Sequence, residues 1–296
     1  MNEPCYKTFT IGIVGTGRVG SSVGILLSRK GHRVIFYDHT FGKARKAARR
    51  ARGAGAVENL REAAREADTV FLTTQDDRIA EADAEIAGCG ALRPGTVVAH
   101  SSGVHASSLL SACRGRGCSV GSMHPLQTVA NTSSGIRNLP GSYFCVEGDP
   151  QAVEILSLLA ADLEGHLLTI PTASKPLYHA AAVMACNYFV GLVGAALDAA
   201  ERIPVARDEA LRALLPLIQG TVKNLAAQGM PHALTGPVAR GDVRTVSQHM
   251  DIIGCLCPEV LELYKLMGSH TLKVARDRGL DQGRARELER LFHNPK

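Results

Sequence analysis

Short apolar runs alternate with longer amphipathic stretches through the first half of the chain. Such runs are typical of strands in a parallel sheet with helices on both faces, because these strands are buried on both sides. The strands predicted in this way are 9–14, 33–37, 69–73, 96–100, 119–123, 143–146 and 167–170. Helices are predicted over 18–29 and 42–52, with further helical segments between the later strands. The pattern predicts an α/β fold with a doubly wound, mostly parallel sheet.

Helical patterning replaces this alternation after Ile170. The segment 171–176 contains two prolines, and a long helix is predicted to begin near Lys175, with a proline in its first turn. Further helices are predicted over 207–228, after Asp242, after Pro258 and over 282–292. We therefore expect two domains, a sheet domain over 1–171 and an all-α domain over 172–296.

The first helix of the second half is unusually apolar. Residues 177–197 contain no Asp, Glu, Lys or Arg over 21 positions, which is long enough to span a bilayer. The segment also contains His179 and Asn187 with many Ala and Gly residues, and the sequence has no second segment of this kind. We therefore expect a buried helix in the core of the helical domain and no contact with a membrane. The first nine residues have no apolar signal core, so a cytoplasmic protein is expected.

Composition narrows the classes of ligand. Hydrophobic residues make up 45% of the 296 residues and charged residues 21%, so the chain can bury a sizeable core. With 7 Phe, 6 Tyr and 0 Trp, the sequence is a weak candidate for stacking single-stranded nucleic acid, and no nucleic-acid partner is expected. The 8 cysteines include no C-x-x-C pair and the 11 histidines are scattered, so no metal site is expected. A net charge of +5 is compatible with an anionic cofactor or substrate.

A glycine-rich segment joins the first predicted strand to the first predicted helix; it reads Gly15, Thr16, Gly17, Arg18, Val19, Gly20. In such a turn the first glycine makes the tight bend, the second lets the backbone approach a pyrophosphate, and the third lets the helix pack on the strand. The helix N-terminus then offers free N–H groups and a partial positive charge to the phosphates. These six residues are the predicted cofactor-binding turn of a Rossmann domain. The alternative is a glycine turn that serves packing alone.

Asp38 ends the second predicted strand, where a carboxylate accepts hydrogen bonds from the adenosine ribose of a dinucleotide. A carboxylate there favours NAD(H), because it repels the 2′-phosphate of NADP(H). Basic residues follow directly and allow two interpretations, a solvated helix face or a clamp for that phosphate; they are His39, Lys43, Arg45, Arg49 and Arg52. The predicted cofactor is NAD(H) or NADP(H), with a slight preference for NAD(H) from Asp38.

Residues that follow strands are the next candidates, because ligands of open α/β sheets lie beyond the carboxyl ends of the strands. Thr73 and Thr74 follow one predicted strand and are expected near the cofactor. Ser101 follows another and is expected to contact the cofactor, with Ser102 beside it as a substrate contact.

His124 follows a third predicted strand and precedes Pro125, which is expected to end that strand and leave His124 pointing above the sheet. Reduction of a carbonyl or imine needs a proton donor near the nicotinamide, because hydride delivery leaves an anion to be protonated. His124 is a candidate for that donor, and the alternative is a structural histidine.

The long helix carries a second set of polar candidates. His179, Val183 and Asn187 are four residues apart and share one helix face, and Lys175 lies one turn before them. Polar groups on an apolar helix need partners. His179 and Asn187 therefore either pair with other helices in the core or line the cleft opposite the nicotinamide.

The segment 234–242 contains a third set of candidate polar residues. Arg240 can clamp a carboxylate and is a candidate anion anchor. For Asp242 a helix cap is the favoured interpretation.

Five segments together resemble a bacterial family. They are the glycine-rich start, His100-Ser-Ser-Gly, His124-Pro-Leu-Gln, LYHAAAVMACN over 177–187 and TGPVARGD over 235–242. The family joins a Rossmann-like domain to a helical C-terminal domain of unknown function, within the 6-phosphogluconate dehydrogenase-like superfamily. Its members are described as NAD(P)-dependent oxidoreductases, which is the class that the resemblance implies.

The wider superfamily includes ketopantoate reductase, pyrroline-carboxylate reductase, prephenate dehydrogenase and the β-hydroxyacid dehydrogenases. Ketopantoate reductases carry Lys-x3-Asn-x3-Asn on the first long helix. If Asn187 matches the last member, His179 and Val183 occupy the other two positions, which argues against a lysine general acid unless Lys175 reaches in. His124 is similar to the histidine of the prephenate dehydrogenase His-Pro pair, which contacts substrate. The resemblance implies a small carbonyl substrate that bears a carboxylate.

These expectations combine into one functional hypothesis, hydride transfer between a nicotinamide and a small carbonyl or hydroxy acid, with ketopantoate-like 2-oxo acid reduction as the specific form. His124 or His179 would donate the proton or polarise the carbonyl, and Asn187 would orient substrate. Arg240 or Lys175 would hold a carboxylate. The alternatives are a dehydrogenase or reductase of prephenate-like or imine substrates, and a dinucleotide-binding sensor without catalysis. A homodimer is expected, because one helical layer rarely buries itself alone.

Overall fold

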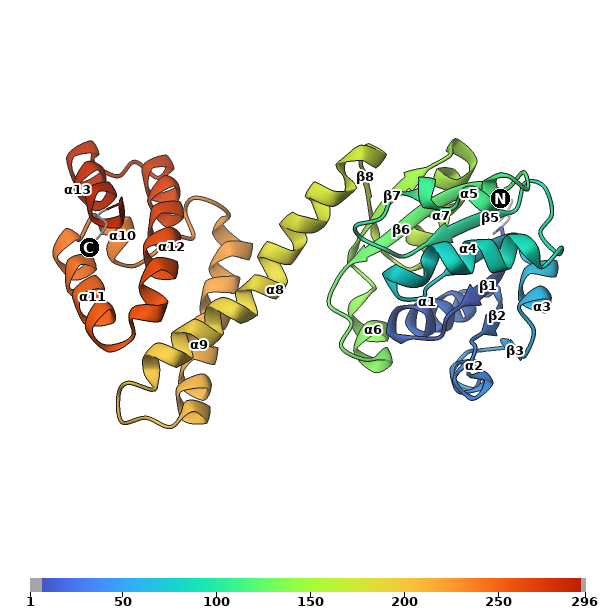
Figure 1. Ribbon diagram of the computed structural model, residues 1–296, viewed down its shortest axis with the longest axis horizontal. Coiled ribbons are helices and arrows are strands. Elements are labelled where there is room, and N and C mark those ends of the chain that lie inside the picture. Colours follow the sequence, from blue (N-terminus) through green and yellow to red (C-terminus); the bar gives the residue numbers. More distant parts are fainter. Residues whose placement is uncertain (1–6, 294–296) are drawn as a thin grey trace, which may run out of the picture. The chain divides into compact units, whose positions relative to one another are not determined.

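The computed structural model describes residues 7–293 and contains one eight-stranded sheet (Figure 1). The strands are β1 (Thr10–Val14), β2 (Arg33–Tyr37), β3 (Gly55–Val57), β4 (Thr69–Leu72), β5 (Val97–His100), β6 (Ser119–Leu126), β7 (Tyr143–Gly148) and β8 (His166–Thr169). They lie in the order β3-β2-β1-β4-β5-β6-β7-β8, and neighbouring strands are parallel except for the antiparallel pair β6 and β7. The predicted class, a doubly wound and mostly parallel sheet followed by helices, is confirmed.

Helices cover both faces of this sheet. They are α1 (Arg18–Arg29), α2 (Phe41–Ala48), α3 (Leu60–Arg65), α4 (Ile79–Gly88), α5 (Ser111–Arg114), α6 (Thr132–Asn138) and α7 (Pro150–Asp162), with short 3-10 turns η1 (Asp76–Arg78), η2 (Ser107–Leu109) and η3 (Thr172–Ser174). Apolar residues of α1, α2 and α7 belong to one core cluster and those of α3, α4 and α5 to another.

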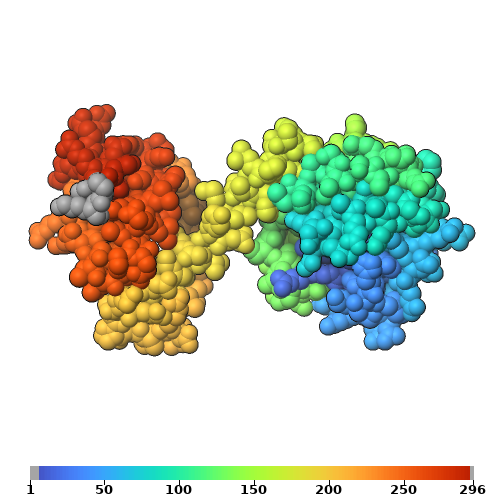
Figure 2. All heavy atoms as spheres, in the orientation of Figure 1, coloured from blue at the N-terminus to red at the C-terminus, as the bar shows by residue number. Residues whose placement is uncertain are grey.

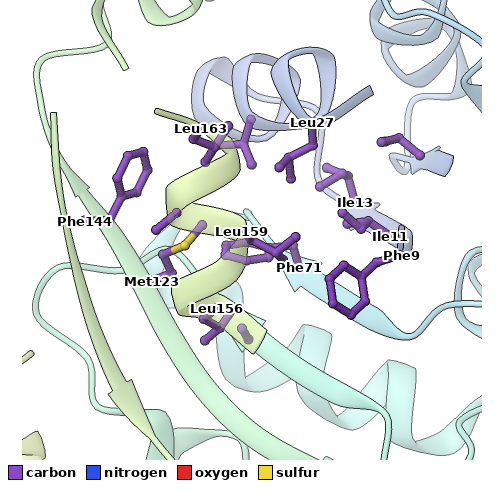
Figure 3. Packing of buried hydrophobic residues seen from close by; sticks show 14 of the residues in the cluster. Phe9, Ile11, Ile13, Leu27, Phe71, Met123, Phe144, Leu156, Leu159 and Leu163 are labelled. Atoms are coloured by element: carbon purple, nitrogen blue, oxygen red, sulfur yellow. The ribbon is translucent and has the colours of Figure 1, made fainter. Parts of the chain in front are cut away.

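Strand β4 shows why the strands are continuous apolar runs. Val70 and Leu72 belong to one core cluster and Phe71 to the other, because successive side chains of a strand point to opposite faces. Figure 3 shows the cluster that contains Phe71, in which Leu27 of α1 and Leu159 of α7 pack over the strands. Burial on both faces favours apolar side chains at most positions of such a strand, and this pattern made the strands recognisable.

The second half of the chain is helical, as predicted. After α8 (Lys175–Ala200), its helices are α9 (Arg207–Gln228), α10 (Pro237–Arg240), α11 (Val243–Leu256), α12 (Pro258–Asp277) and α13 (Gln282–His293). Residues of α10 to α13 form a separate core cluster that includes Val246, Leu272 and Phe292. The ring of Phe292 lies where a Cβ on Gly268 would stand, 2.3 Å from its nearest ring carbon, so a glycine there lets α12 and α13 approach closely.

Helix α8 differs from its prediction. It was expected to be buried in the helical core, but only 6% of its most apolar window is buried (Figure 2, yellow). Leu177, Tyr188 and Val190 are 77%, 66% and 69% exposed. Within residues 7–293, the segment Thr172–Ala200 is long and apolar enough to cross a membrane by length and composition, with a mean hydropathy of 1.8. Periodicity cannot tell a helix covered by its own chain from one covered by another molecule.

The chain divides into two compact units inside α8, between Met184 and Ala185. The sequence had suggested a boundary at residue 171, before this helix. The first turns of α8 stay with the sheet, because Lys175 and Tyr178 contact residues of β6 and β7.

Two local expectations were wrong. Pro125 does not end its strand: β6 continues to Leu126, and Pro125 pairs with Phe144 on the antiparallel neighbour β7. The basic helix predicted over 42–52 ends at Ala48, so Arg52 does not extend its face. The short strand β3 was not predicted, because it has three residues and only partial burial.

Candidate functional site

The glycine-rich turn connects β1 to α1 as predicted. The N–H of Gly15 donates to the carbonyl oxygen of Tyr37 at 2.9 Å, and Gly15 has a φ of +96°, a conformation that disfavours other residues. The side chain of Thr73 donates to the carbonyl oxygen of Gly15 at 2.6 Å and so ties the turn to the end of β4. The turn is therefore held by β2 and β4 on either side.

The other two glycines of the turn differ in their surroundings. A Cβ on Gly20 would lie 2.1 Å from Thr73 Oγ1 and 2.2 Å from the carbonyl oxygen of Gly15, so the fold itself requires glycine there. A Cβ on Gly17 would meet nothing within 4 Å. Packing therefore explains Gly20 but leaves Gly17 unexplained, which is the pattern expected if a ligand approaches the backbone at Gly17.

The N-terminus of α1 is free to receive an anion. Gly17 is its N-cap residue, no side chain caps the helix, and no acidic residue lies in the first turn. Uncapped helix N-termini present N–H groups and partial positive charge. Arg18 lines the cavity described next, whereas Val19 packs against the core.

A cavity of about 730 Å³ lies beside this turn. Its walls come from the ends of β1, β2 and β4 and from η1 and α4, and its lining includes Gly15, Thr16, Gly17, Arg18, Asp38, His39, Lys43, Thr73 and Thr74. The residues that follow β2 and β4 and were predicted to bind a cofactor therefore all line this cavity; they are Asp38, His39, Thr73 and Thr74. Ser101 and Val19 are not part of this lining.

Asp38 is bonded to the turn as well as facing the cavity. Its Oδ2 accepts hydrogen bonds from the N–H and the hydroxyl of Thr16 at 2.8 and 2.9 Å, and its Oδ1 accepts from the N–H of Thr40 at 3.0 Å. Burial raises the pKa of Asp38, but these hydrogen bonds and nearby Lys43 outweigh it and hold the pKa below its usual value. The carboxylate is thus charged at neutral pH, with acceptor capacity left on Oδ1.

The basic residues after Asp38 separate into two groups. His39 and Lys43 line the cavity. Arg45 stacks over the ring of Phe41 at 6.0 Å, and Arg49 and Arg52 are not among the lining residues.

A second cluster forms farther along the same edge of the sheet, where β5 and β6 end. Nδ1 of His124 and the hydroxyl of Tyr178 share a hydrogen bond of 2.9 Å, and the rings of His124 and His179 are 6.0 Å apart. Gly103 packs against both rings, since a Cβ there would lie 2.5 Å from Cδ2 of His179 and 2.9 Å from Nε2 of His124. The structure therefore brings His124 and His179 together.

The serines after β5 build the wall of this cluster. The N–H of Ser101 donates to the carbonyl oxygen of Leu72 at 3.3 Å, which continues the sheet. The N–H of Ser102 donates to Nδ1 of His100 at 3.2 Å, and its hydroxyl accepts the N–H of His105 at 3.1 Å. Ser102 is buried and holds the loop instead of projecting from it.

Lys175 is placed behind the cluster. Its side chain is fully buried, and its Nζ donates to the carbonyl oxygen of Ser102 at 2.8 Å and lies 3.5 Å from Oε1 of Glu147. Burial lowers the pKa of Lys175, while the charge of Glu147 raises it. This placement favours a role inside the fold over contact with substrate.

His124 and the neighbouring His100 are neutral at physiological pH. Burial, and then the charge of Lys175, lower the pKa of His124 to about 4. The same two causes lower the pKa of His100 to about 4. Burial raises the pKa of Tyr178. Neutral imidazole has one N–H donor and one acceptor, so His124 can relay a proton and bind Tyr178 at once.

The remaining predicted residues lie in the second unit. Asn187 is exposed, although a place in the core or in a cleft was expected. Arg240 lines a cavity of about 520 Å³ together with Arg278 and Arg284. Asp242 caps α11, as predicted: its Oδ1 accepts the N–H of Thr245 at 3.1 Å.

Two residues in or directly behind the histidine cluster were not identified from the sequence. Tyr178 stands directly before His179 in an apolar helix, and Glu147 is an acidic residue near the end of β7. A buried charge in a strand signals a partner of opposite charge, but the sequence does not say which one. Among residues 7–293, no three His, Cys, Asp or Glu side chains gather as metal ligands.

Several solved structures are similar to this chain. A protein from Thermotoga maritima is 23% identical, with a TM-score of 0.72 over 90% of this chain and 99% of that one. A pyrroline-5-carboxylate reductase from Coxiella burnetii is 16% identical, with a TM-score of 0.61 over 95% and 99%. A reductive aminase from Aspergillus terreus, in complex with NADPH and ethyl-5-oxohexanoate, is 16% identical, with a TM-score of 0.56 over 97% and 93%. At this identity the likeness shows the fold.

No curated protein matches the sequence. Residues 5–125 match the family described as Rossmann-like domain, and residues 142–271 match the domain of unknown function DUF2520. The chain therefore matches a Rossmann-like domain in its first half and DUF2520 in its second, the combination that its sequence motifs indicated.

Proposed function

We propose that the protein is an oxidoreductase that uses a nicotinamide dinucleotide. The observation that carries this proposal is the contrast between Gly20, which packing explains, and Gly17, which faces open space at an uncapped helix N-terminus. The N–H groups there would bind the pyrophosphate. Asp38 would accept a ribose hydroxyl with the remaining capacity of Oδ1.

One further observation supports occupation of this cavity. The hydroxyl oxygen of Thr74 is buried, and no partner for it is found within residues 7–293. Buried polar atoms are normally hydrogen-bonded. Thr74 lines the cavity, so a ligand there would supply the partner. When bound, the dinucleotide would supply or accept a hydride.

The histidine cluster would handle the proton. With the Tyr178 hydroxyl donating to Nδ1, the proton of neutral His124 resides on Nε2, the nitrogen beside Gly103 and His179. From there His124 would protonate an oxyanion or polarise a carbonyl. His179 is the second candidate donor. Arg240 and Asn187 lie in the second unit, and their roles stay predictions from the sequence.

Reduction of a small 2-oxo acid such as ketopantoate, in the cytoplasm, is the specific form of this proposal. The alternative is an imine or prephenate-like substrate, and the similarity to a pyrroline-5-carboxylate reductase and a reductive aminase supports the imine form. Between the cofactors, the charged Asp38 favours NAD(H), and Lys43 on the same cavity wall is the feature that would favour NADP(H).

The test begins with binding. Fluorescence titration of the protein with NADH and NADPH should give saturable binding, and Gly17→Ala should weaken it at least about tenfold without lowering the thermal midpoint. Gly88→Ala is the matched control, because Gly88 also meets open space but lies at the end of α4, outside the cavity lining. Equal weakening in both variants, or no binding by the native protein, contradicts the proposal.

Turnover then separates an enzyme from a sensor. Oxidation of the reduced cofactor is followed with a panel of 2-oxo acids, cyclic imines and prephenate. Tight binding without turnover on any compound would favour a dinucleotide sensor.

We also propose that the protein is a homodimer whose contact includes α8. Large apolar side chains of α8 and α9, among them Val190 and Leu217, are exposed to water in a single chain. Val190→Arg should convert the dimer to a monomer in light scattering, whereas Lys273→Met at an exposed position of α12 should not. A native protein that is already monomeric contradicts this proposal.

A further inference from the structure

A buried ion pair lies directly behind the histidine cluster. The side chains of Lys175 and Glu147 are 0% and 2% exposed, and Nζ lies 3.5 Å from Oε1. Buried charges are costly unless their hydrogen-bonding positions are filled. The partners of this pair therefore show which parts of the fold it holds.

Every donor of the Lys175 ammonium has a partner. Nζ donates to the carbonyl oxygen of Ser102 at 2.8 Å and to the hydroxyl of Ser122, and Glu147 is its third contact. An ammonium has three N–H donors and no acceptor, so none remains for a substrate. Loss of its proton would leave the Glu147 carboxylate uncompensated in the interior.

The acceptors of Glu147 are filled as well. Oε1 accepts the N–H of Ser107 at 2.9 Å in addition to the Lys175 contact. Oε2 accepts the hydroxyls of Ser107 and Thr172 at 2.7 and 2.8 Å. The pair thus joins β6 and β7 to the turn after β5 and to the segment just before α8.

The Ser102 carbonyl links the Lys175–Glu147 pair to the histidines. Ser102 precedes Gly103, whose backbone packs against the rings of His124 and His179 so closely that a Cβ would not fit. Displacement of the Ser102 carbonyl would therefore displace the wall that both rings contact.

Helix α8 carries the same constraint by a second route. Tyr178 and His179 follow Lys175 by three and four residues, so the three side chains share one face of the first turns. An anchored Lys175 fixes the rotation of this face, and with it the 2.9 Å hydrogen bond between Tyr178 and His124.

We propose that Lys175 is a positioning residue which, paired with Glu147, sets the arrangement of His124, Tyr178 and His179 and exchanges no proton with the substrate. The catalytic meaning of this arrangement rests on the proposed function. The arrangement itself can be measured without any substrate.

Electrostatics gives the proposal a readout that a structural role alone would not move. The groups acting on His124 are Lys175, His179 and His100, which lower its pKa, and Asp76, which raises it. Lys175 is the largest of these after burial. Its replacement by a neutral side chain should therefore raise the pKa of His124.

The experiment follows the imidazole resonances of His124 and His179 by NMR in histidine-labelled protein across pH. Lys175→Met should shift both sets of resonances and raise the midpoint of His124 by at least about one pH unit. Lys223→Met, which removes a charge from exposed α9, should leave both unchanged. NADH affinity should stay within about twofold in all variants, because the glycine turn lies elsewhere on the sheet edge.

Two further variants keep the test decisive if Lys175→Met does not fold. Lys175→Met with Glu147→Gln removes both charges and leaves none uncompensated, and it should reproduce the resonance shifts. Ser122→Ala keeps both charges, removes one acceptor of Lys175, and should give smaller shifts in the same resonances. Native resonances and a native His124 midpoint in every folded variant overturn the proposal.

Kinetics separates positioning from proton donation. With a substrate found in the turnover panel, a positioning role predicts that Lys175→Met lowers kcat and moves the acidic limb of the pH profile upward. If turnover is abolished while both histidines keep their native resonances, Lys175 is the donor and the proposal is wrong. If the native protein binds no dinucleotide, the proposed function fails, but the resonances still decide whether Lys175 positions the histidines.

Discussion

The glycine turn and the histidine cluster lie at the same edge of one sheet, but the turn is formed by backbone groups and the cluster by side chains. The turn acts through backbone: the bend at Gly15, the open face of Gly17 and the uncapped start of α1. The cluster acts through side chains from β6 and α8, held by a buried pair from β7 and α8. A backbone site needs a few neighbouring residues, whereas a side-chain site needs the whole fold to bring its members together.

The largest expected effect separates chemistry from cofactor binding. His124→Ala should lower turnover by about 10²–10⁴-fold, because it removes the proposed proton donor. NADH affinity should stay within about twofold. Stopped-flow turnover with fluorescence titration measures both quantities, and unaltered turnover removes His124 from the mechanism.

Acid should weaken the histidine cluster before it affects the turn. His124 and His100 have pKa values of about 4 in the folded protein against 6.5 in the unfolded chain. Between these values the unfolded chain binds more protons, so stability should fall as pH drops from 6.5 to 4, by on the order of 3 kcal/mol for each histidine. Urea unfolding across this range measures the slope.

His124→Asn is the control for this prediction. An asparagine does not titrate, so the slope between pH 4 and 6.5 should be shallower by about the share of one histidine. A native slope in this variant would show that His124 is not the group responsible.

The second and third glycines of the turn should respond differently to the same small substitution. Gly20→Ala should lower stability by about 1–3 kcal/mol, because the new methyl group meets Thr73 Oγ1 and the Gly15 carbonyl oxygen. Gly17→Ala should leave stability within about 0.5 kcal/mol, because nothing lies within 4 Å. Thermal unfolding measures both, and equal losses would show that Gly17 also serves packing.

The smallest effect concerns the choice of cofactor. Asp38→Asn removes the charge that repels a 2′-phosphate, so the ratio of NADPH to NADH affinity should rise by up to about tenfold. Lys43→Ala should lower the same ratio if Lys43 contacts that phosphate. Paired titrations measure the ratios, and a ratio unchanged in both variants would place the adenosine ribose away from Asp38.

Most of the fold, but only part of the candidate site, could be predicted from the sequence. The strand and helix positions followed from apolar periodicity, because a parallel sheet covered on both faces leaves an unbroken hydrophobic run in each strand. The cap at Asp242 was also predictable, since its partner Thr245 is three residues away. Expectations about Pro125 and the apolar helix were wrong because pairing with β7 and burial by other chain segments are long-range properties.

By itself, the sequence determined the element order, the glycine turn and the chemical types of the candidate groups, because these depend on neighbouring residues and on periodicity. Only the tertiary structure decided that His124 contacts Tyr178 and His179. It also decided that Lys175 forms a buried ion pair with Glu147. Of the basic residues after Asp38, it placed Lys43 in the cavity lining but not Arg49 or Arg52. Residues 124 and 178, or 147 and 175, carry no local signal of their contact. Their distances are set by how strands and helices pack, which depends on the whole core at once.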